Sequence, residues 1–142
     1  MKRKLLIVLV GAVVLLVGIQ LVPVDRTNPP VVADFNGPAD VESVVRVSCY
    51  DCHSNEVRWP WYSRVAPASW LVARDVEEAR ERLNFSEWGT YDARRRTKMA
   101  EEMWEEVEHG EMPLPVYLKM HRGAEVEPAG LTTLRRWAGA DH

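Results

Sequence analysis

The chain has two cysteines, which stand three residues apart, and a histidine directly follows the second one. Cys49, Cys52 and His53 form the pattern C-x-x-C-H, and residues at i, i+3 and i+4 project from one face of a helix. Two such thiols can form thioether bonds to the vinyl groups on one porphyrin edge, and the next imidazole can reach the iron. This is the attachment pattern of c-type haem. We predict one covalent haem c on Cys49 and Cys52, with His53 as an axial iron ligand.

Two other uses of these residues stand as alternatives. A zinc site needs four ligands, so Cys49, Cys52 and His53 would require His109 or His121 as the fourth. A redox-active dithiol of the thioredoxin kind lies in a βαβ neighbourhood, and the sequence contains no convincing strand pattern. Haem attachment is the favoured interpretation, because chance rarely places two cysteines and a histidine at this spacing.

The second axial ligand is predicted to be Met112, which lies in a Gly-x-Met-Pro context where a loop could turn its thioether toward the porphyrin. A thioether ligand raises the reduction potential relative to bis-histidine ligation. His121 is the alternative ligand, followed by His109 and by an open site. Met112 could also fill a core gap, as methionines commonly do, and we favour that role for Met99 and Met103.

The aromatic segment after the motif contains hydrogen-bond donors that could hold the haem propionates. We assign this role to Trp59, Trp61, Tyr62 and Arg64, with ordinary core packing as the alternative for the three aromatic residues. The imidazole of His53 should donate its other N–H to a backbone carbonyl. We expect that carbonyl in the loop that contains Pro60 and Pro67.

Helical patterns are expected to position these residues. Apolar side chains recur at helical spacing over residues 39–52, 68–83 and 91–109, and a last helix begins near Pro128. The third of these is the clearest, because Met99, Met103 and Val107 form one row and Gly110 follows as a C-cap. The sequence therefore predicts an all-α domain over residues 39–142.

The N-terminus predicts a membrane anchor. Lys2, Arg3 and Lys4 precede the uncharged stretch Leu5 to Val22, which would be about 27 Å long as a helix, close to the roughly 30 Å hydrocarbon core. We predict a single transmembrane helix within residues 1–24, with a cleaved signal peptide as the alternative. The positive cluster then stays in the cytoplasm, which places the rest of the chain in the periplasm, anchored to the inner membrane. Residues 25–38 read as a linker.

Several short motifs resemble those of a known family. They are Cys49-Tyr50-Asp51-Cys52-His53-Ser54-Asn55, Trp59-Pro60-Trp61-Tyr62-Ser63, Ala66-Pro67, Asn84-Phe85-Ser86-Glu87-Trp88 and Gly110-Glu111-Met112-Pro113-Leu114, with Tyr117 and His121 behind. Over residues 38–138 the chain is similar to the small exported haem-binding domain proteins related to class I cytochromes c. The resemblance implies a cytochrome-c-like helical fold around one covalent haem c, with Met112 at the position of the distal methionine.

These expectations point to an electron-transfer protein rather than an enzyme. The formal net charge of -3 gives no basic footprint for nucleic acid, so the expected partners are the membrane and redox proteins that the sequence does not identify. A haem peroxidase, with Glu111 and His121 as acid–base groups, is one alternative. A redox or gas sensor with a displaceable distal ligand is another.

Overall fold

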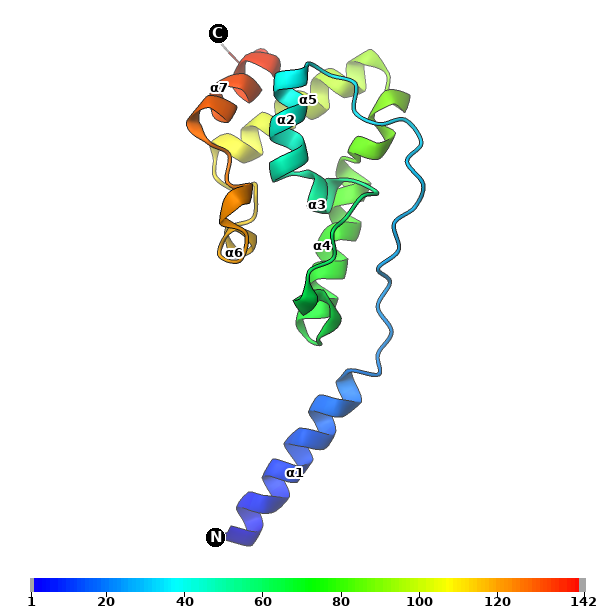
Figure 1. Ribbon diagram of the computed structural model, residues 1–142, viewed down its shortest axis with the longest axis vertical. Helices are drawn as coiled ribbons and strands as arrows, with labels where there is room; N and C mark the ends of the chain where they lie inside the picture. The colour runs from blue at the N-terminus through cyan, green and yellow to red at the C-terminus, as the bar shows by residue number, and fades with distance from the viewer. Residues whose placement is uncertain (1, 141–142) are drawn as a thin grey trace.

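The computed structural model describes residues 2–140, and in this range the secondary structure is entirely helical (Figure 1). The helices are α1 (Lys2–Ile19), α2 (Ala39–Ser48), α3 (Tyr50–His53), α4 (Ala68–Arg82), α5 (Ala93–Glu108), α6 (Pro115–Leu118) and α7 (Pro128–Trp137). Short 3-10 helices are η1 (Trp61–Arg64), η2 (Phe85–Thr90) and η3 (Arg122–Ala124). The predicted all-α fold is confirmed.

The longest helix of the domain, α5, follows from its sequence. Asp92 caps its N-terminus by accepting a hydrogen bond from the backbone N–H of Arg95 at 2.8 Å. Ala100, Met103, Trp104 and Val107 are buried, and their i, i+3, i+4, i+7 spacing places them on one face. The helix ends before Gly110, whose φ of +72° suits a residue without a Cβ.

The hydrophobic core lies where α2, α5 and α7 pack together, above the end of α4 (Figure 1). Phe85 and Leu134 are fully buried in it. Phe85 stacks on Tyr50, with ring centroids 5.2 Å apart, and meets Phe35 edge to face at 5.6 Å. Aromatic pairs in these arrangements stabilise a core beyond the area that they bury. Helix α7 approaches α2 closely because Gly130, which has no side chain, faces Val44.

A buried polar network joins the chain after the C-x-x-C-H motif to the segment after α4. The Asn84 side chain donates to Oδ1 of Asn55 at 2.9 Å and accepts from the Ser86 N–H at 3.0 Å. The Ser86 hydroxyl in turn accepts from the Asn55 N–H at 2.9 Å. All three residues are at most 5% exposed. Buried polar groups are costly unless paired, and here each pairs with another member of the network.

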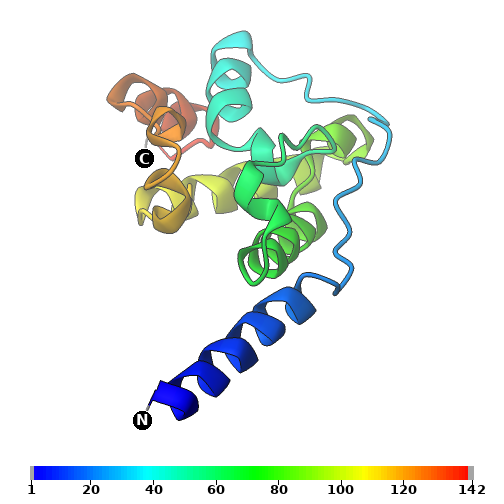
Figure 2. The ribbon, with the colours of Figure 1, turned by 60° about the horizontal axis from the view of Figure 1, so that its bottom comes forward.

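Residues 25–34 form a strap that runs as an extended chain along one side of the domain (Figure 2). The Arg80 guanidinium, on α4, donates to the carbonyl of Thr27 at 3.1 Å and to the side chain of Asn28 at 2.8 Å. Asn28 donates to the Val57 carbonyl at 3.0 Å. Just before the strap, Gln20 exchanges two hydrogen bonds with the backbone of Ala66. The segment expected to be a linker is therefore bonded to the domain along its length.

Asp34, at the end of the strap, is tied to α2 and α3. It accepts a hydrogen bond from Tyr50 at 2.8 Å and pairs with Arg46 at 2.6 Å. Partial burial would raise the pKa of Asp34, but the hydrogen bonds from Arg46 and Tyr50 outweigh it, so the pKa is lowered overall. The carboxylate therefore contributes to stability in its charged form.

The predicted transmembrane helix is not supported. In the part of the chain that the structure describes, no helix is both long and apolar enough to cross a membrane. Helix α1 ends at Ile19, short of Val22, and Lys2, Arg3 and Lys4 belong to its 18 residues. The apolar remainder would be roughly 22 Å long, well below the thickness of the hydrocarbon core. The prediction of a single-pass protein of the inner membrane is therefore wrong, because the uncharged stretch is not helical throughout.

Candidate functional site

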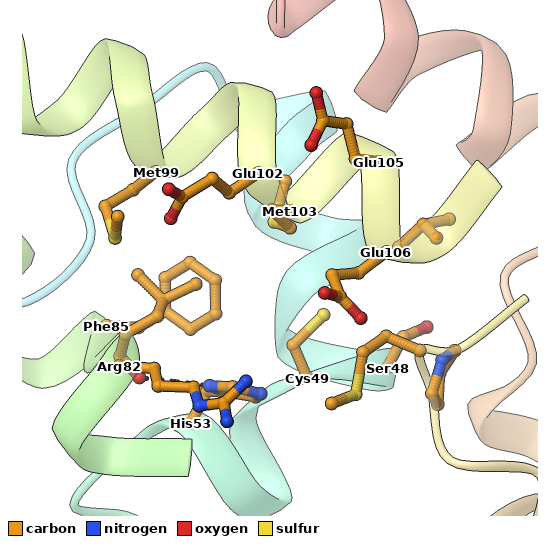
Figure 3. Close-up of a pocket in the computed structure, with 14 residues that line it drawn as sticks. Ser48, Cys49, His53, Arg82, Phe85, Met99, Glu102, Met103, Glu105 and Glu106 are labelled. Carbon is orange, nitrogen blue, oxygen red and sulfur yellow. Dashed lines mark hydrogen bonds between the residues drawn. The ribbon is translucent and has the colours of Figure 1, made fainter. Parts of the chain in front are cut away.

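A cavity of about 420 Å³ lies between the C-x-x-C-H turn, the end of α4 and the face of α5 (Figure 3). This volume is in the range of small-molecule binding pockets. Its lining residues are Ser48, Cys49, His53, Arg82, Leu83, Phe85, Met99, Glu102, Met103, Glu105, Glu106, Val107, Met112 and Pro113. Figure 3 shows Met99 and Met103 on α5 across the cavity from His53 and Arg82. The sequence motif and the methionines therefore face one shared space.

His53 is held in a defined orientation by the C-terminal end of α4. Its Nδ1 lies 3.0 Å from the Leu83 carbonyl and 3.1 Å from the Ala79 carbonyl. Carbonyls only accept, so Nδ1 carries the hydrogen, and Nε2 keeps its lone pair for a metal. The acceptors are at the helix end rather than in the loop of Pro60 and Pro67, where we expected them. The Leu83 carbonyl lies at the C-cap and is free to accept from His53, whereas the Ala79 carbonyl also accepts from the Leu83 N–H at 2.9 Å.

The protonation state of His53 suits metal binding. Burial lowers the pKa of the imidazole and outweighs the two carbonyl hydrogen bonds, which act in the opposite direction. The ring is therefore neutral at neutral pH. A neutral imidazole with a fixed tautomer is the form in which histidine binds a metal.

The two cysteines stand on the single turn α3 and its N-cap. The amides of Cys52 and His53 both donate to the Cys49 carbonyl, at 3.1 Å and 2.9 Å, and both thiols are free. Burial, followed by the neighbouring Cys52, raises the pKa of Cys49 to about 12. Burial, followed by Asp51, raises the pKa of Cys52 to about 11. Cys49 lines the cavity, whereas Cys52 is not among its lining residues.

These properties bear on the alternatives to haem. A dithiol redox site depends on a thiolate with a lowered pKa, and here the pKa of both thiols is raised. Within residues 2–140, no group of three or more His, Cys, Asp or Glu side chains is arranged to hold a metal ion. The fourth ligand that a zinc site would require is therefore not assembled beside the motif.

Met112 reaches the cavity from the segment after α5. The amides of Glu111 and Met112 both donate to the Glu106 carbonyl, at 2.9 Å and 3.1 Å, which folds the chain back against the helix end. Met112 and His53 therefore line the same cavity, as the prediction of a distal ligand requires. Met99 and Met103 contact the core, as expected, but they also line the cavity.

The alternative distal ligands do not line the cavity. The ring of His121 stacks on Tyr117, with centroids 4.1 Å apart, and its Nδ1 lies 3.5 Å from the Tyr62 hydroxyl. His109 is exposed at the C-cap of α5. Glu111, which we considered as an acid–base group, is also exposed and outside the lining.

The structure does not bring the expected propionate-binding residues to the cavity either. They are Trp59, Trp61, Tyr62 and Arg64, and none of them lines it. Trp61 is 70% exposed and Arg64 is exposed as well. Tyr62 contacts His121, and Trp59 lines a separate hollow beside Arg80. The presence of hydrogen-bond donors in a side chain was therefore not a sufficient criterion for assigning it to the cavity.

The sequence reasoning missed other residues that line the cavity. Arg82, in the last turn of α4, is a cation at the cavity, and Glu102, Glu105 and Glu106 come from α5. In Figure 3, the carboxylates of Glu102 and Glu106 extend toward the cavity, and that of Glu105 points away. Glu102 and Glu106 could have been found from the sequence, because they lie three residues after Met99 and Met103 and so share their helix face.

The donor set fits a haem. The lining contains a neutral imidazole (His53), a thiol (Cys49), the thioethers of Met99, Met103 and Met112, and apolar surface from Leu83, Phe85 and Val107. An imidazole opposite a thioether is an established axial pair for haem iron. Arg82 could pair with an anionic propionate.

Comparison with known proteins agrees with this geometry. A family model described as a haem-binding domain matches residues 14–140, which is most of the chain. No curated protein and no solved structure matches the sequence.

Proposed function

Because the chain belongs to the family of haem-binding domains, we propose that it is a monohaem c-type cytochrome that binds its haem covalently and transfers electrons without being an enzyme. The observation that carries this proposal is the shared cavity, which Cys49, His53 and Met112 all line. Cys52 would supply the second thioether bond, and Arg82 would hold a propionate. The haem, when bound, supplies a one-electron couple between ferric and ferrous iron.

The residues around the cavity would influence this redox couple by holding the iron ligands in place and by excluding water. The carbonyls of Ala79 and Leu83 keep the His53 imidazole in one orientation, so that ligation changes little during electron transfer. Leu83 and Phe85, both at most 8% exposed, exclude water from that side of the cavity. Ligation by the Met112 thioether would raise the reduction potential relative to a second imidazole.

The first test concerns covalent attachment. We expect the purified protein, produced with a cytochrome c maturation system, to retain its haem after denaturation and to give a c-type pyridine haemochrome. Cys49→Ala/Cys52→Ala should lose all haem that survives denaturation, because no thiol remains to form a thioether. His109→Ala, which changes an exposed residue outside the cavity, is the matched control and should retain it. Covalent haem in the double variant would contradict the attachment sites.

The second test concerns the distal ligand. Met112→Ala should abolish the weak long-wavelength iron–sulfur charge-transfer band of the ferric protein. Met99→Ala removes another cavity methionine, and Met120→Ala removes one that is 60% exposed. We expect both of these variants to keep the band. Loss of the band in Met99→Ala but not in Met112→Ala would assign the ligand to α5 instead.

A catalytic role is the competing hypothesis. The acid–base residues that we expected for a haem peroxidase, Glu111 and His121, do not line the cavity. Electron transfer requires no such residues beside the iron, and we therefore propose it in preference to catalysis. Peroxide turnover by the purified haem protein at rates typical of enzymes, about 1–1,000 per second, would refute this choice.

A further inference from the structure

A hydrogen bond connects the C-x-x-C-H turn to the segment that follows Met112. The Tyr117 hydroxyl, on α6, donates to Oδ2 of Asp51 at 2.8 Å. Asp51 lies between Cys49 and Cys52, and Tyr117 lies five residues after Met112. The bond therefore joins the turn that carries His53 to the segment that carries Met112.

Aromatic contacts hold Tyr117 in place. Its ring stacks on His121, with an interplanar angle of 9°. Tyr62, on η1, packs against the other side of this cluster, with its ring centroid 6.0 Å from that of His121. Burial, together with the hydrogen bond to Asp51, raises the pKa of Tyr117, so its hydroxyl remains a donor at neutral pH. Tyr117 is thus bonded directly to the C-x-x-C-H turn and connected through His121 to η1.

The chain between Met112 and Tyr117 is short and stiff. Pro113 and Pro115 restrict its backbone, because a proline ring fixes φ. The end that begins at Met112 is bonded to the Glu106 carbonyl at 3.1 Å, and the other end closes one helical turn from Leu114 to Tyr117. A shift of Tyr117 is therefore transmitted to Met112 instead of being absorbed between them.

We propose that Tyr117 is a positioning residue, whose hydrogen bond to Asp51 holds the Met112 segment against the C-x-x-C-H turn and keeps Met112 at the cavity that His53 lines. The inference rests on the proposed haem function and on Met112 as the distal ligand. It makes the separation of the two axial ligands depend on a contact outside the cavity, since neither Asp51 nor Tyr117 lines it.

The test uses imidazole, which competes with a thioether for ferric iron. Its affinity for the ferric holoprotein should rise about tenfold or more in Tyr117→Phe and in Asp51→Ala, because a hydrogen bond to a charged group is worth at least that factor. Asp51→Asn keeps an oxygen acceptor without the charge, so its imidazole affinity should lie between those of wild type and Asp51→Ala. The double variant Tyr117→Phe/Asp51→Ala should match the single variants, since both remove one interaction.

A matched control is available within the motif. Tyr50 donates to Asp34 at 2.8 Å, the same kind of hydrogen bond, but this bond leads to the strap and not to Met112. Tyr50→Phe should therefore leave the imidazole affinity within about twofold of wild type, as expected for a site without a shared partner. Amide hydrogen exchange over residues 111–121 supplies a second readout, and it should accelerate in Tyr117→Phe but not in Tyr50→Phe.

The outcomes separate a failure of the positioning role of Tyr117 from a failure of the proposed haem function. Imidazole affinity and amide exchange in Tyr117→Phe that equal those of Tyr50→Phe would overturn the positioning role, even when both variants carry covalent haem. A wild-type protein without covalent haem would overturn the proposed function, and this inference with it. An imidazole affinity that rises in Asp51→Ala and rises less in Asp51→Asn supports the hydrogen bond itself as the cause.

Discussion

Replacing Asn84 by alanine removes the centre of the buried polar network. The residue is 4% exposed. Its side chain donates a hydrogen bond to Asn55 and accepts one from the backbone N–H of Ser86. The network lies directly beside the cavity, because Leu83 supplies an acceptor for His53 and Phe85 forms part of the cavity wall. The variant therefore tests whether these polar contacts hold the site in place.

The expected loss of stability follows from the two buried groups that lose their hydrogen bonds to Asn84. In Asn84→Ala, Oδ1 of Asn55 and the N–H of Ser86 are left buried and unpaired, at a cost of about 1–3 kcal/mol each, or about 2–6 kcal/mol together. A domain of this size is stable by only about 5–15 kcal/mol. We therefore expect a variant that is folded but much weakened, with faster amide exchange at the end of α4.

Guanidinium unfolding of the haem-loaded protein, followed by tryptophan fluorescence and far-UV circular dichroism, measures this loss. The midpoint should fall without a change in the dependence on denaturant, which would show that stability alone has changed. Asn36→Ala makes the same chemical change at an exposed residue and should alter the free energy of unfolding by less than about 0.5 kcal/mol. A loss below about 1 kcal/mol in Asn84→Ala would refute the reasoning, because unpaired buried groups cost at least that much.

Three further predictions use the same unfolding assay. Asp34→Asn should be less stable than wild type at neutral pH, and the difference should disappear as the pH falls below about 4. The pKa of Asp34 is lowered in the folded protein, so this carboxylate, which accepts from Tyr50, stabilises the fold only while it is charged. A difference in stability that does not change with pH would contradict this. Gly130→Val should cost about 1–3 kcal/mol through overpacking, since even a Cβ would lie 3.3 Å from Val44. Trp61→Ala should change stability by less than about 0.5 kcal/mol, because this side chain is 70% exposed.

Features set by local spacing were predictable from the sequence. The separation of Cys49, Cys52 and His53 on one helical turn depends only on helix geometry. The row of Met99, Met103 and Val107 depends on the same periodicity. The Met-Pro context of Met112 indicated a loop after a helix, and the structure places that loop at the cavity.

Features set by contacts between distant segments were not predictable. The acceptors of His53 belong to α4, 26 and 30 residues further along the chain, and the sequence gives no signal for backbone carbonyls. Trp61 has a suitable donor but does not line the cavity, since hydrogen-bonding capacity does not determine location. The end of α1 at Ile19 was missed because hydropathy alone does not show where an apolar stretch stops being helical.

The strap also determines how mechanical force would travel through the molecule. A pull on α1 would first load the hydrogen bonds of Gln20 with Ala66, and then those of Arg80 with Thr27 and Asn28. Because Gln20 precedes Thr27 and Asn28 along the chain, these bonds would be loaded one after another. The Gln20 bonds begin one residue after the end of α1, so α1 can move away from the domain only after they break.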